Sequence, residues 1–545
     1  MKSTFMKKQK PTEFKLTQEY ILSVNSKSYL GKKGYTIPKS ALSSIDLEFL
    51  RKELFVKPIV PGVNYNPQSD DANAFPVFRE NANKMYLPRF YGIERYGVVS
   101  KTEISEGDNI DLQFAKQLRD VQTKIVDVYM KHVQNPICSE SNINGGGGIL
   151  EVFCGAGKTV MALNIISLLH KKTLIIVHKE FLMNQWIERI NEFLPTARIG
   201  KIQGKIFDIE NKDIVIGMVQ TLYDKEYNSN TFSSFGLTII DEVHRIGSEQ
   251  FSRTLIKIIT PYMLGISATV DRKDKLTRVL YMFIGDKIYA QQREAEDVVR
   301  VRAIKYINAD NKFNEVELDF RGNAKYSTMI SKLCGFDPRS DFIVRVVADL
   351  LNENKEKQMM ILGHNRSLLT YLYNAIVKLN LTSIGYYVGG MKQQNLVETE
   401  SKQIILATYA MAAEALDIKT LSTLIMITPK TDITQSVGRI LRIKDNNPII
   451  VDIVDTHSIF QNQWTQRKRF YKKCNYSIRQ IDSIKYTDMT NVDTIDWKRV
   501  FEPVVKTNDN IIIDTDDVEC DSEDDVFITK RKCVIDVSLF TPLNI

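Results

Sequence analysis

Short apolar runs alternate with longer stretches of helical spacing through most of this chain. In the first half, the apolar runs occupy residues 149–153, 174–177, 214–216, 237–240 and 263–266. After a more polar stretch at about 291–340, a second series occupies residues 359–362, 384–388, 404–407, 424–427 and 449–451. Continuous apolar runs that alternate with helices are typical of buried parallel strands. The pattern therefore predicts an α/β fold with two parallel-sheet lobes.

Length and composition are consistent with several soluble domains. At 545 residues the chain is too long for one hydrophobic core, and its 43% hydrophobic and 26% charged residues are typical of globular proteins. No apolar run reaches the roughly 18 residues of a membrane span, and the N-terminus lacks the pattern of a secretory signal. The six cysteines are scattered without a CxxC pair, which favours a reducing compartment over a zinc or disulfide framework. We therefore expect an intracellular protein that does not enter membranes.

The net charge is +7 and the isoelectric point is about 8.8. This balance suits a polyanionic partner, and a Lys-rich solvated surface explains it equally well. The C-terminal tail carries an acidic cluster, so the remainder is more basic than the whole: Asp514, Asp516, Asp517, Glu519, Asp521, Glu523, Asp524 and Asp525. Such a run is most often a solvated segment and sometimes a docking tail.

These features divide the chain into five parts. We expect an N-terminal accessory domain at 1–105, a first lobe at 106–290, a linker or insertion at 291–345, a second lobe at 346–485, and a C-terminal extension with the acidic tail at 486–545. The accessory domain interleaves aromatic and basic residues: Phe75, Phe78, Arg79, Lys84, Tyr86, Arg89, Phe90, Tyr91, Arg95 and Tyr96. Rings and cations together can clamp nucleic acid. The alternative is an aromatic core from which Arg side chains reach the surface.

A glycine-rich loop, CGAGKT at 154–159, lies between an apolar run and a helical pattern. Its glycines let backbone N–H groups converge on phosphate oxygens, Lys158 can reach the β- and γ-phosphates, and the Thr159 hydroxyl can bind Mg²⁺. Val152 stands where the usual GxxxxGK[ST] pattern has its first Gly. The loop predicts a binding site for ATP or GTP, formed by Gly155, Ala156, Gly157, Lys158 and Thr159.

Two carboxylates, Asp241 and Glu242, directly follow the buried run 237–240. Open α/β sheets bind their ligands at the carboxyl ends of such strands. One carboxylate can bind Mg²⁺, and the second can accept a proton from an attacking water, as hydrolysis of a phosphoanhydride requires. A solvated Asp-Glu turn is the alternative, and the apolar strand before the pair favours the catalytic interpretation.

A third motif, QSVGRILR at 435–442, lies in the second lobe. In a helix, Gln435, Arg439 and Arg442 fall at i, i+4 and i+7 and therefore on one face. Converging guanidinium groups suit the stabilisation of a γ-phosphate during transfer. A basic, solvent-exposed helix face is the alternative.

Taken in chain order, these motifs resemble those of superfamily 2 helicases and translocases, whose two RecA-like lobes close on ATP. The resemblance runs from about Leu118 to Arg442 and implies two tandem RecA-like lobes that use ATP and Mg²⁺, with Mg²⁺ on Thr159 and Asp241. It implies that Gln122 and Asp417 belong to the nucleotide site, that Glu242 is the catalytic base, and that Gln435, Arg439 and Arg442 assist. Coupling residues implied by the resemblance are His244, Ser267 and Thr269. Implied nucleic-acid contacts are His178, Lys179, Gln220, Thr221, Gly389, Gly390 and Thr408.

Within the superfamily, SATVDRKD at 267–274 and YYVGG at 386–390 are similar to the XPB-like branch. The segment YLPRFYG at 86–92 resembles poxviral transcript-release helicases and their relatives in large cytoplasmic DNA viruses. The resemblance implies a DNA track, 3′ to 5′ movement, and a role in transcription, replication or repair, with RNA polymerase or other transcription proteins among the partners. A viral origin implies the host cytoplasm or the virion. Val270 and Ala415 depart from the branch, which has Pro and Gly there, and a missing Gly restricts close approach of the backbone to phosphate.

Three other functions fit parts of the same pattern. DExH boxes also occur in RNA helicases that act on transcripts. A nucleic-acid-binding scaffold without turnover is a second alternative, against which the intact Lys158, Asp241, Glu242 and Arg442 argue. A motor subunit of a restriction complex is a third, although no nuclease-like cluster of acidic residues and lysine is evident.

Overall fold

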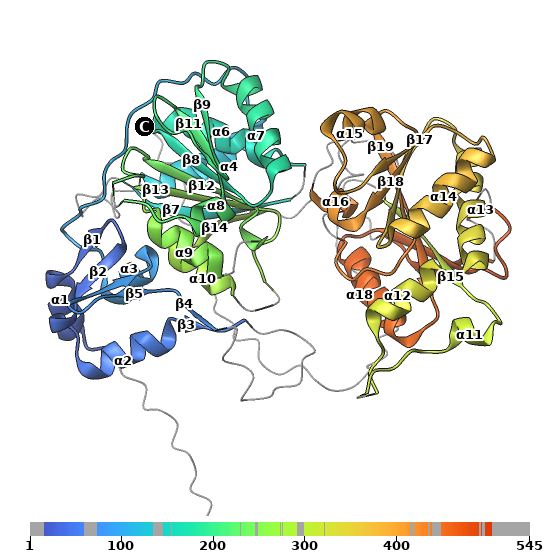
Figure 1. Cartoon of the computed structure of the whole chain (residues 1–545), viewed down its shortest axis with the longest axis horizontal. Helices are drawn as coiled ribbons and strands as arrows, with labels where there is room; N and C mark the ends of the chain where they lie inside the picture. Colours follow the sequence, from blue (N-terminus) through green and yellow to red (C-terminus); the bar gives the residue numbers. More distant parts are fainter. Residues whose placement is uncertain are drawn as a thin grey trace, which may run out of the picture. The chain divides into compact units, whose positions relative to one another are not determined.

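The computed structural model describes three folded parts, which follow one another along the colour bar of Figure 1. The described residues are 16–58, 74–134, 145–153, 155–228, 230–245, 249–272, 274, 276–291, 299–320, 322–414, 418, 420–433, 436–438, 448–489, 492 and 496–503.

The N-terminal part is built on an antiparallel sheet of order β1-β2-β6-β5. Its strands are β1 (Tyr29–Gly31), β2 (Gly34–Pro38), β5 (Arg79–Glu80) and β6 (Lys84–Leu87), and β3 (Phe55–Val56) pairs separately with β4 (Phe75–Pro76). The helices are α1 (Gln18–Lys27), the 3-10 turn η1 (Lys39–Ala41), α2 (Ser44–Glu53) and α3 (Arg89–Tyr96). Helix α3 packs closely on β2, because a Cβ at Gly92 would lie 2.2 Å from the ring of Tyr35.

Four of the ten aromatic and basic residues singled out in this part are buried, and the other six are half-buried. Phe75, Tyr91 and Tyr96 are buried. Arg89 is 3% exposed, and its Nη1 donates to the carbonyl oxygens of Thr260 and Pro261 at 3.1 and 2.7 Å. These contacts favour the packing alternative for these residues, and a nucleic-acid role for the domain stays a prediction.

The first lobe contains a sheet whose order, within the described residues, is β10-β9-β11-β8-β12-β13-β7-β14. The pairs are parallel except for β9 and β10, which are antiparallel. The strands are β7 (Gly147–Val152), β8 (Thr173–Val177), β9 (Ile199–Gln203), β10 (Ile206–Phe207), β11 (Ile214–Met218), β12 (Leu237–Asp241), β13 (Tyr262–Ser267) and β14 (Lys287–Gln291). The helices are α4 (Asp120–Val133), α6 (Lys158–Leu169), α7 (Glu180–Phe193), α8 (Val219–Asp224), η3 (Val243–Arg245), α9 (Glu249–Lys257) and α10 (Thr277–Ile284).

The second lobe repeats this architecture with the order β17-β18-β16-β19-β20-β15-β21-β22 among its described strands. Only the edge pair β21 and β22 is antiparallel. The strands are β15 (Arg300–Tyr306), β16 (Gln358–Gly363), β17 (Ile384–Tyr387), β18 (Ile404–Thr408), β19 (Leu421–Met426), β20 (Ile449–Asp455), β21 (Ser477–Asp482) and β22 (Lys498–Phe501). The helices are α11 (Asn311–Asn314), α12 (Tyr326–Cys334), α13 (Asp337–Glu353), α14 (Arg366–Lys378), α15 (Gln393–Glu400), α16 (Tyr409–Glu414) and α18 (Ser458–Lys473).

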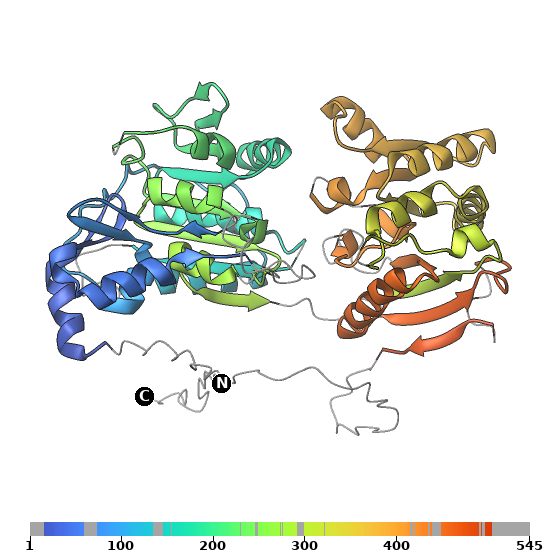
Figure 2. The same ribbon diagram turned by 60° about the horizontal axis from the view of Figure 1, so that its bottom comes forward.

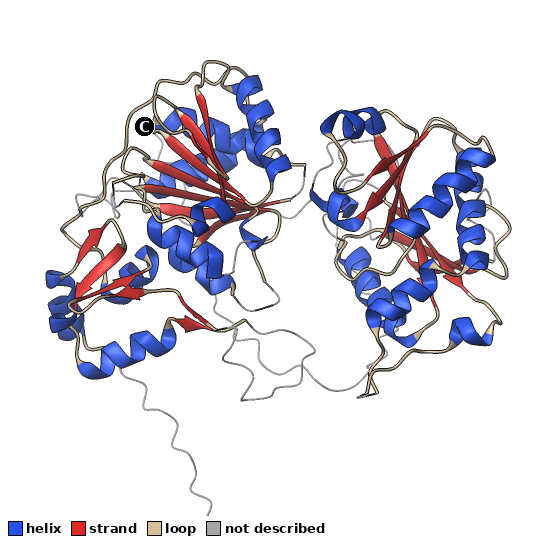
Figure 3. Ribbon diagram, in the orientation of Figure 1, coloured by secondary structure: helices blue, strands red, loops and turns tan. Residues whose placement is uncertain are grey.

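Helices cover both faces of each large sheet, as Figure 3 and the turned view in Figure 2 show. Successive side chains along a strand point to opposite faces. In β8, Leu174 and Ile176 therefore join one hydrophobic core while Ile175 and Val177 join the other. A strand buried on both faces reads as a continuous apolar run. Every run proposed as a strand from the sequence is a strand in the structure.

The second lobe is larger than the sequence indicates. β15 lies in the stretch 291–345 that we expected to be a linker or insertion, yet it pairs in parallel with both β20 and β21. β22 lies in the predicted C-terminal extension, yet it pairs with β21. The sequence of β15 is more polar than that of the other central strands because it contains Arg302. This residue is 4% exposed. Its Nη2 donates to Glu353 Oε1 at 2.7 Å, so the buried charge is compensated.

Candidate functional site

The phosphate loop leads from the end of β7 into α6, as predicted. Gly155 and Gly157 have φ angles of 90° and 88°, in the left-handed region where Gly is favoured. Gly157 is the N-cap of α6, so the unpaired N–H groups of the helix start at the loop. Lys158 and Thr159 are the first two residues of α6. A helix N-terminus behind such a loop is an anion site. Cys154 lies outside the described residues.

Gln122 holds this loop from the side. Its Nε2 donates to the carbonyl oxygen of Ala156 at 2.8 Å, and its Oε1 accepts from the backbone N–H of Arg119 at 3.0 Å. Arg119 Nη2 donates to the same Ala156 oxygen at 3.2 Å. A Cβ at Gly157 would lie 2.4 Å from Gln122 Nε2, so only Gly allows this approach. The structure therefore brings Gln122 to the loop backbone, and its predicted role in binding the nucleotide stays a prediction.

The two predicted carboxylates lie at the end of β12. Asp241 is 6% exposed, and its Oδ2 accepts from the indole Nε1 of Trp186 at 2.9 Å. Burial, and then the charge of Glu242, raise the pKa of Asp241 to about 6, while Trp186 and Lys158 act in the opposite direction. Glu242 Oε1 lies 3.8 Å from Lys158 Nζ. Glu242 has a φ angle of 53°, uncommon for a residue with a side chain. The loop and the carboxylates thus meet in one site.

This pair fits a divalent cation. Two adjacent carboxylates, one of them buried, face one lysine in the contacts described here. Burial, and then the charge of Glu242, raise the pKa of Asp241, and a bound cation would offset the cost of ionising it. Carboxylate and hydroxyl oxygens are the ligands that Mg²⁺ prefers.

A chain of polar contacts runs from Glu242 to the segment after β13. His244 Nδ1 lies 3.2 Å from Glu242 Oε2 and 2.7 Å from Ser267 Oγ. Ser267 Oγ donates to the carbonyl oxygen of Thr269 at 2.6 Å. Because a hydroxyl has one hydrogen to donate, Ser267 Oγ accepts from His244, which places a proton on Nδ1. The three predicted coupling residues are therefore in one network. Arg272 extends it by donating to the carbonyl oxygen of His244.

The nucleic-acid contacts predicted in the first lobe lie together at the ends of β8 and β11, which are adjacent strands. Gln220 Nε2 donates to the carbonyl oxygen of His178 at 3.0 Å, and Lys179 is the N-cap of α7. Thr221 Oγ1 accepts from the N–H of Gly204 at 2.9 Å, and its side chain is buried. Thr221 thus supports the turn after β9, whereas Gln220 is exposed at this edge.

In the second lobe, Gly389 and Gly390 follow β17, and Thr408 is the last residue of the adjacent strand β18. Gly390 has a φ angle of 85°, and a Cβ on either glycine would meet nothing within 4 Å. Arg366 donates to the carbonyl oxygen of Gly389. His364 follows β16 beside Thr408, and burial, then Lys430, lower its pKa to about 4. Sequence reasoning missed Arg366 and His364. Gln435, Arg439, Arg442 and Asp417 lie outside the described residues.

Comparison with known proteins identifies the family. The family model described as type III restriction enzyme, res subunit, matches residues 115–272. A protein of Acanthamoeba polyphaga mimivirus named "Putative ATP-dependent RNA helicase" is 33% identical over 476 residues, which cover 84% of this chain and 87% of that relative. The chain belongs to the superfamily 2 helicases.

Two further relatives of this helicase differ in the track that their names give. A protein of African swine fever virus, again named "Putative ATP-dependent RNA helicase", is 27% identical over 404 residues, covering 69% of this chain and 77% of that protein. The "DNA 3'-5' translocase XPB2" of Sulfurisphaera tokodaii is 23% identical over 416 residues, covering 67% and 89%. The predictions of two RecA-like lobes and of an ATP-dependent enzyme are confirmed. None of the described helices is both long and apolar enough for a membrane span.

The helicase binds Asp241 through the indole of Trp186, whose Nε1 donates to Asp241 Oδ2. We predict that Trp186→Phe destabilises the first lobe by about 1–3 kcal/mol, because a buried carboxylate loses its donor. We also expect about 10- to 100-fold weaker activation of ATP turnover by Mg²⁺, as for other residues that orient a metal ligand. Urea unfolding and a Mg²⁺ titration of turnover check both. Trp464→Phe, the same change at a buried indole of the second lobe, is the matched control. Equal Mg²⁺ dependence in the two variants would refute the role.

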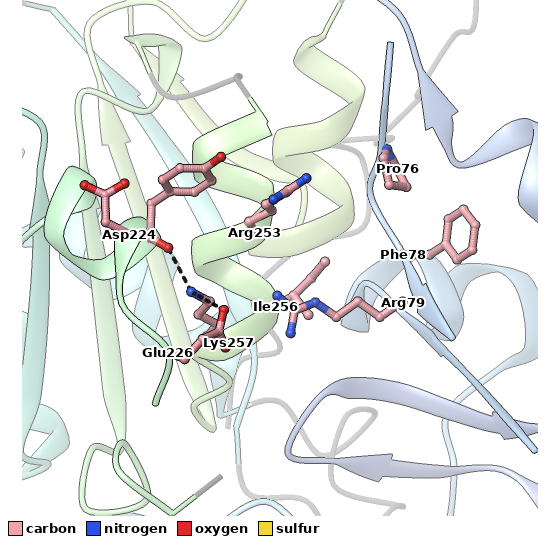
Figure 4. Close-up of a pocket in the computed structure, with 9 residues that line it drawn as sticks. Pro76, Phe78, Arg79, Asp224, Glu226, Arg253, Ile256 and Lys257 are labelled. Atoms are coloured by element: carbon pink, nitrogen blue, oxygen red, sulfur yellow. Dashed lines mark hydrogen bonds and ion pairs between the residues drawn. The ribbon is translucent and has the colours of Figure 1, made fainter. Parts of the chain in front are cut away.

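A cleft of the helicase lies between the N-terminal part and the first lobe (Figure 4), with a volume of about 480 Å³. Arg79 enters it from β5, and Arg253 and Lys257 come from α9. Lys257 Nζ donates to the carbonyl oxygens of Tyr223 and Lys225 at 2.9 and 2.8 Å, which fixes the end of α8. Arg253 pairs with Glu249 at 2.5 Å, whereas Arg79 has no carboxylate within 4.0 Å among the described residues.

Proposed function

We propose that this helicase is an ATP-driven DNA translocase that moves 3′ to 5′ and unwinds DNA. The contact chain from Glu242 through His244 to Ser267 and Thr269 supports the motor part most directly. In this proposal, Glu242 contacts the γ-phosphate and the attacking water. A change in the contacts of Glu242 during hydrolysis would alter those of His244 and Ser267 and so move the segment after β13. Coupling of hydrolysis to movement requires such a link.

In the proposed reaction, the N–H groups of the phosphate loop and Lys158 bind the phosphates, and Glu242 orients water and accepts its proton. Thr159 and Asp241 would hold Mg²⁺, which neutralises phosphate charge when bound. From the family resemblance, we propose that Gln435, Arg439 and Arg442 complete the site from the second lobe and that Asp417 belongs to it. Those four residues lie outside the described residues, so their part rests on sequence alone.

DNA is favoured over RNA by the likeness to a DNA 3′–5′ translocase and by the motifs at 267–274 and 386–390. The printed names of the viral relatives favour the second candidate, an RNA helicase that acts on transcripts. We propose that the nucleic acid binds at the ends of strands in both lobes. The residues are His178, Lys179 and Gln220 in the first lobe and Gly389, Gly390 and Thr408 in the second. Exposed glycine backbone suits phosphate contacts that do not depend on sequence.

We further propose that the N-terminal domain engages nucleic acid at the cleft of Figure 4. Arg79 supports this, because its guanidinium enters the cleft without a described carboxylate partner. We also propose a role in viral transcript release, replication or repair, in the host cytoplasm or the virion; the viral source of the relatives supports the viral setting alone.

A stimulated-turnover experiment tests the proposal. ATP hydrolysis is measured with duplex DNA, single-stranded DNA and single-stranded RNA of matched length at one salt concentration, because phosphate contacts are strongly salt-dependent. We expect DNA to stimulate turnover at least about 10-fold more than RNA, an advantage of about 1.4 kcal/mol. Strand displacement should then require a 3′ overhang. Stimulation by RNA alone would establish the second candidate instead, and no stimulation by any polymer would refute a motor.

A further inference from the structure

The end of α18 and the edge strand β22 carry six cations. They are Lys468, Arg469, Lys472, Lys473, Lys498 and Arg499. All are exposed except Lys468, which is half-buried. None of the six has a carboxylate oxygen within 4.0 Å among the residues that the structure describes. Arg467 of the same helix differs, because it is buried and its Nε and Nη2 donate to the two oxygens of Asp452 at 2.8 and 2.9 Å. The helix thus neutralises its inner cation, and its outer cations have no acidic partner in the described part of the chain.

Three of these cations come from two neighbouring elements, α18 and β22. Lys468 and Lys472 lie one turn apart on the same face of α18. Burial, and then the charges of Lys472 and Lys498, lower the pKa of Lys468, so Lys468 lies in the field of both other cations. Lys472 Nζ lies 5.9 Å from the centre of the Phe501 ring in β22, which joins the helix to the strand. Lys468, Lys472 and Lys498 are called the α18–β22 cluster below.

The cluster is far from the nucleic-acid contacts proposed above for the second lobe. β22 and β17 form opposite edges of the second sheet. Seven spacings of about 4.8 Å separate the two edges, which is on the order of 30 Å. Figures 1 and 2 both show α18 well away from β17 within this lobe. Gly389, Gly390 and Thr408 lie at the β17–β18 edge. A ligand on the cluster therefore occupies a separate surface.

We propose that the α18–β22 cluster is a second nucleic-acid site, which holds the phosphate backbone of DNA outside the track. This inference rests on the proposed function, because it takes DNA as the polyanion. Like charges held together without a counter-charge cost free energy, and a phosphate backbone supplies regularly spaced anions that remove the cost. A lysine ammonium group acts as a point charge and lacks the planar fork with which Arg can recognise its ligands. Its contacts with phosphate are therefore independent of the DNA sequence.

DNA suits the cluster better than an acidic peptide does. Peptide docking depends on apolar or aromatic anchors in desolvated pockets. Here Phe501, the ring that Lys472 approaches, is half-buried and already packed against a hydrophobic core of the second lobe. The surface therefore offers charge on a helix and an edge strand, which fits a backbone of repeated charges.

The test compares two full-length triple variants. K468Q/K472Q/K498Q removes the cluster. K312Q/K355Q/K378Q removes three exposed lysines elsewhere in the second lobe and is the matched control for net charge. Binding of a fluorescent DNA duplex with a 3′ overhang is measured without nucleotide at several salt concentrations. We expect the cluster variant to bind about tenfold or more weakly and its log K against log salt slope to fall by about 2–3, close to one per lost phosphate contact. The control should change less than about twofold, because its lysines make no phosphate contact in this account.

Three further readouts separate the outcomes. Basal ATP turnover should be unchanged in both variants, and the cluster variant should melt no lower than wild type because repulsion is removed. If it fails to fold, the exposed single changes K472Q and K498Q carry the test through their salt slopes. DNA binding equal to that of the control overturns the proposal. Loss of poly-glutamate binding with unchanged DNA binding overturns it in favour of an acidic peptide. Cluster-dependent DNA binding without any DNA-stimulated turnover would refute the translocase and leave this site standing.

Discussion

Glu242→Gln is expected to reduce ATP turnover by about 10²–10⁴-fold, the usual contribution of a general base. The amide keeps the size of the side chain and cannot accept a proton from water. It also removes the charge that, together with burial, raises the pKa of Asp241 to about 6. Asp241 should then ionise more readily, so binding of Mg²⁺ and ATP should be retained or strengthened. Phosphate release and the affinity for a fluorescent ATP analogue measure the two effects.

The matched control for this change is Glu210→Gln, an exposed carboxylate of the same lobe. It should leave both turnover and nucleotide affinity unchanged. Turnover near that of wild type in Glu242→Gln would remove Glu242 from the reaction. Loss of nucleotide binding together with turnover would instead assign it to binding.

Lys158→Ala is expected to lower turnover by about 10²–10³-fold or more, as for the loss of one preorganised donor at a developing negative charge. Unlike Glu242→Gln, it should also weaken nucleotide binding, because the lost ammonium group is the cation of the phosphate loop. The fold should persist. Ala is the best helix former at the start of α6, and the contact of Lys158 with Glu242 is long, at 3.8 Å.

Thermal unfolding and nucleotide binding check this prediction, with Lys131→Ala on the exposed face of α4 as control. The distinguishing result is a variant that melts like the control and neither binds nor hydrolyses ATP. A variant that binds ATP as tightly as wild type would show that the loop amides alone hold the phosphates.

The central strands were predictable, because a strand covered on both faces must be apolar at every position. β8 and β12 are buried along their whole length and show this pattern. The strands near the β22 edge of the second sheet were not predictable by the same rule. In β21 only Ile478 and Ile481 are buried, among half-buried polar residues, and β15 has a buried Arg302 that pairs with Glu353. The predicted limits of the second lobe were wrong for this reason.

The places of the candidate site residues in the fold were predictable, because the proposed chemistry requires a fixed local sequence. Lys158 must begin the helix after the glycine turn, and Asp241 must end its strand. The contacts that hold them were not, because they join residues far apart in the chain. Trp186 and Asp241 are 55 positions apart, and Gln122 and Ala156 are 34 apart. A tryptophan in an amphipathic helix is typical of a core residue, and only the fold shows that its N–H reaches a carboxylate.

Strand displacement with ATP and with a non-hydrolysable analogue tests the central claim most directly. The substrate is a DNA duplex with a 3′ overhang, and the proteins are the wild-type helicase and Glu242→Gln. We expect displacement only by the wild type and only with ATP, since in the proposed mechanism the contact chain from Glu242 to Thr269 links hydrolysis to movement. Displacement with the analogue, or by Glu242→Gln, would contradict it.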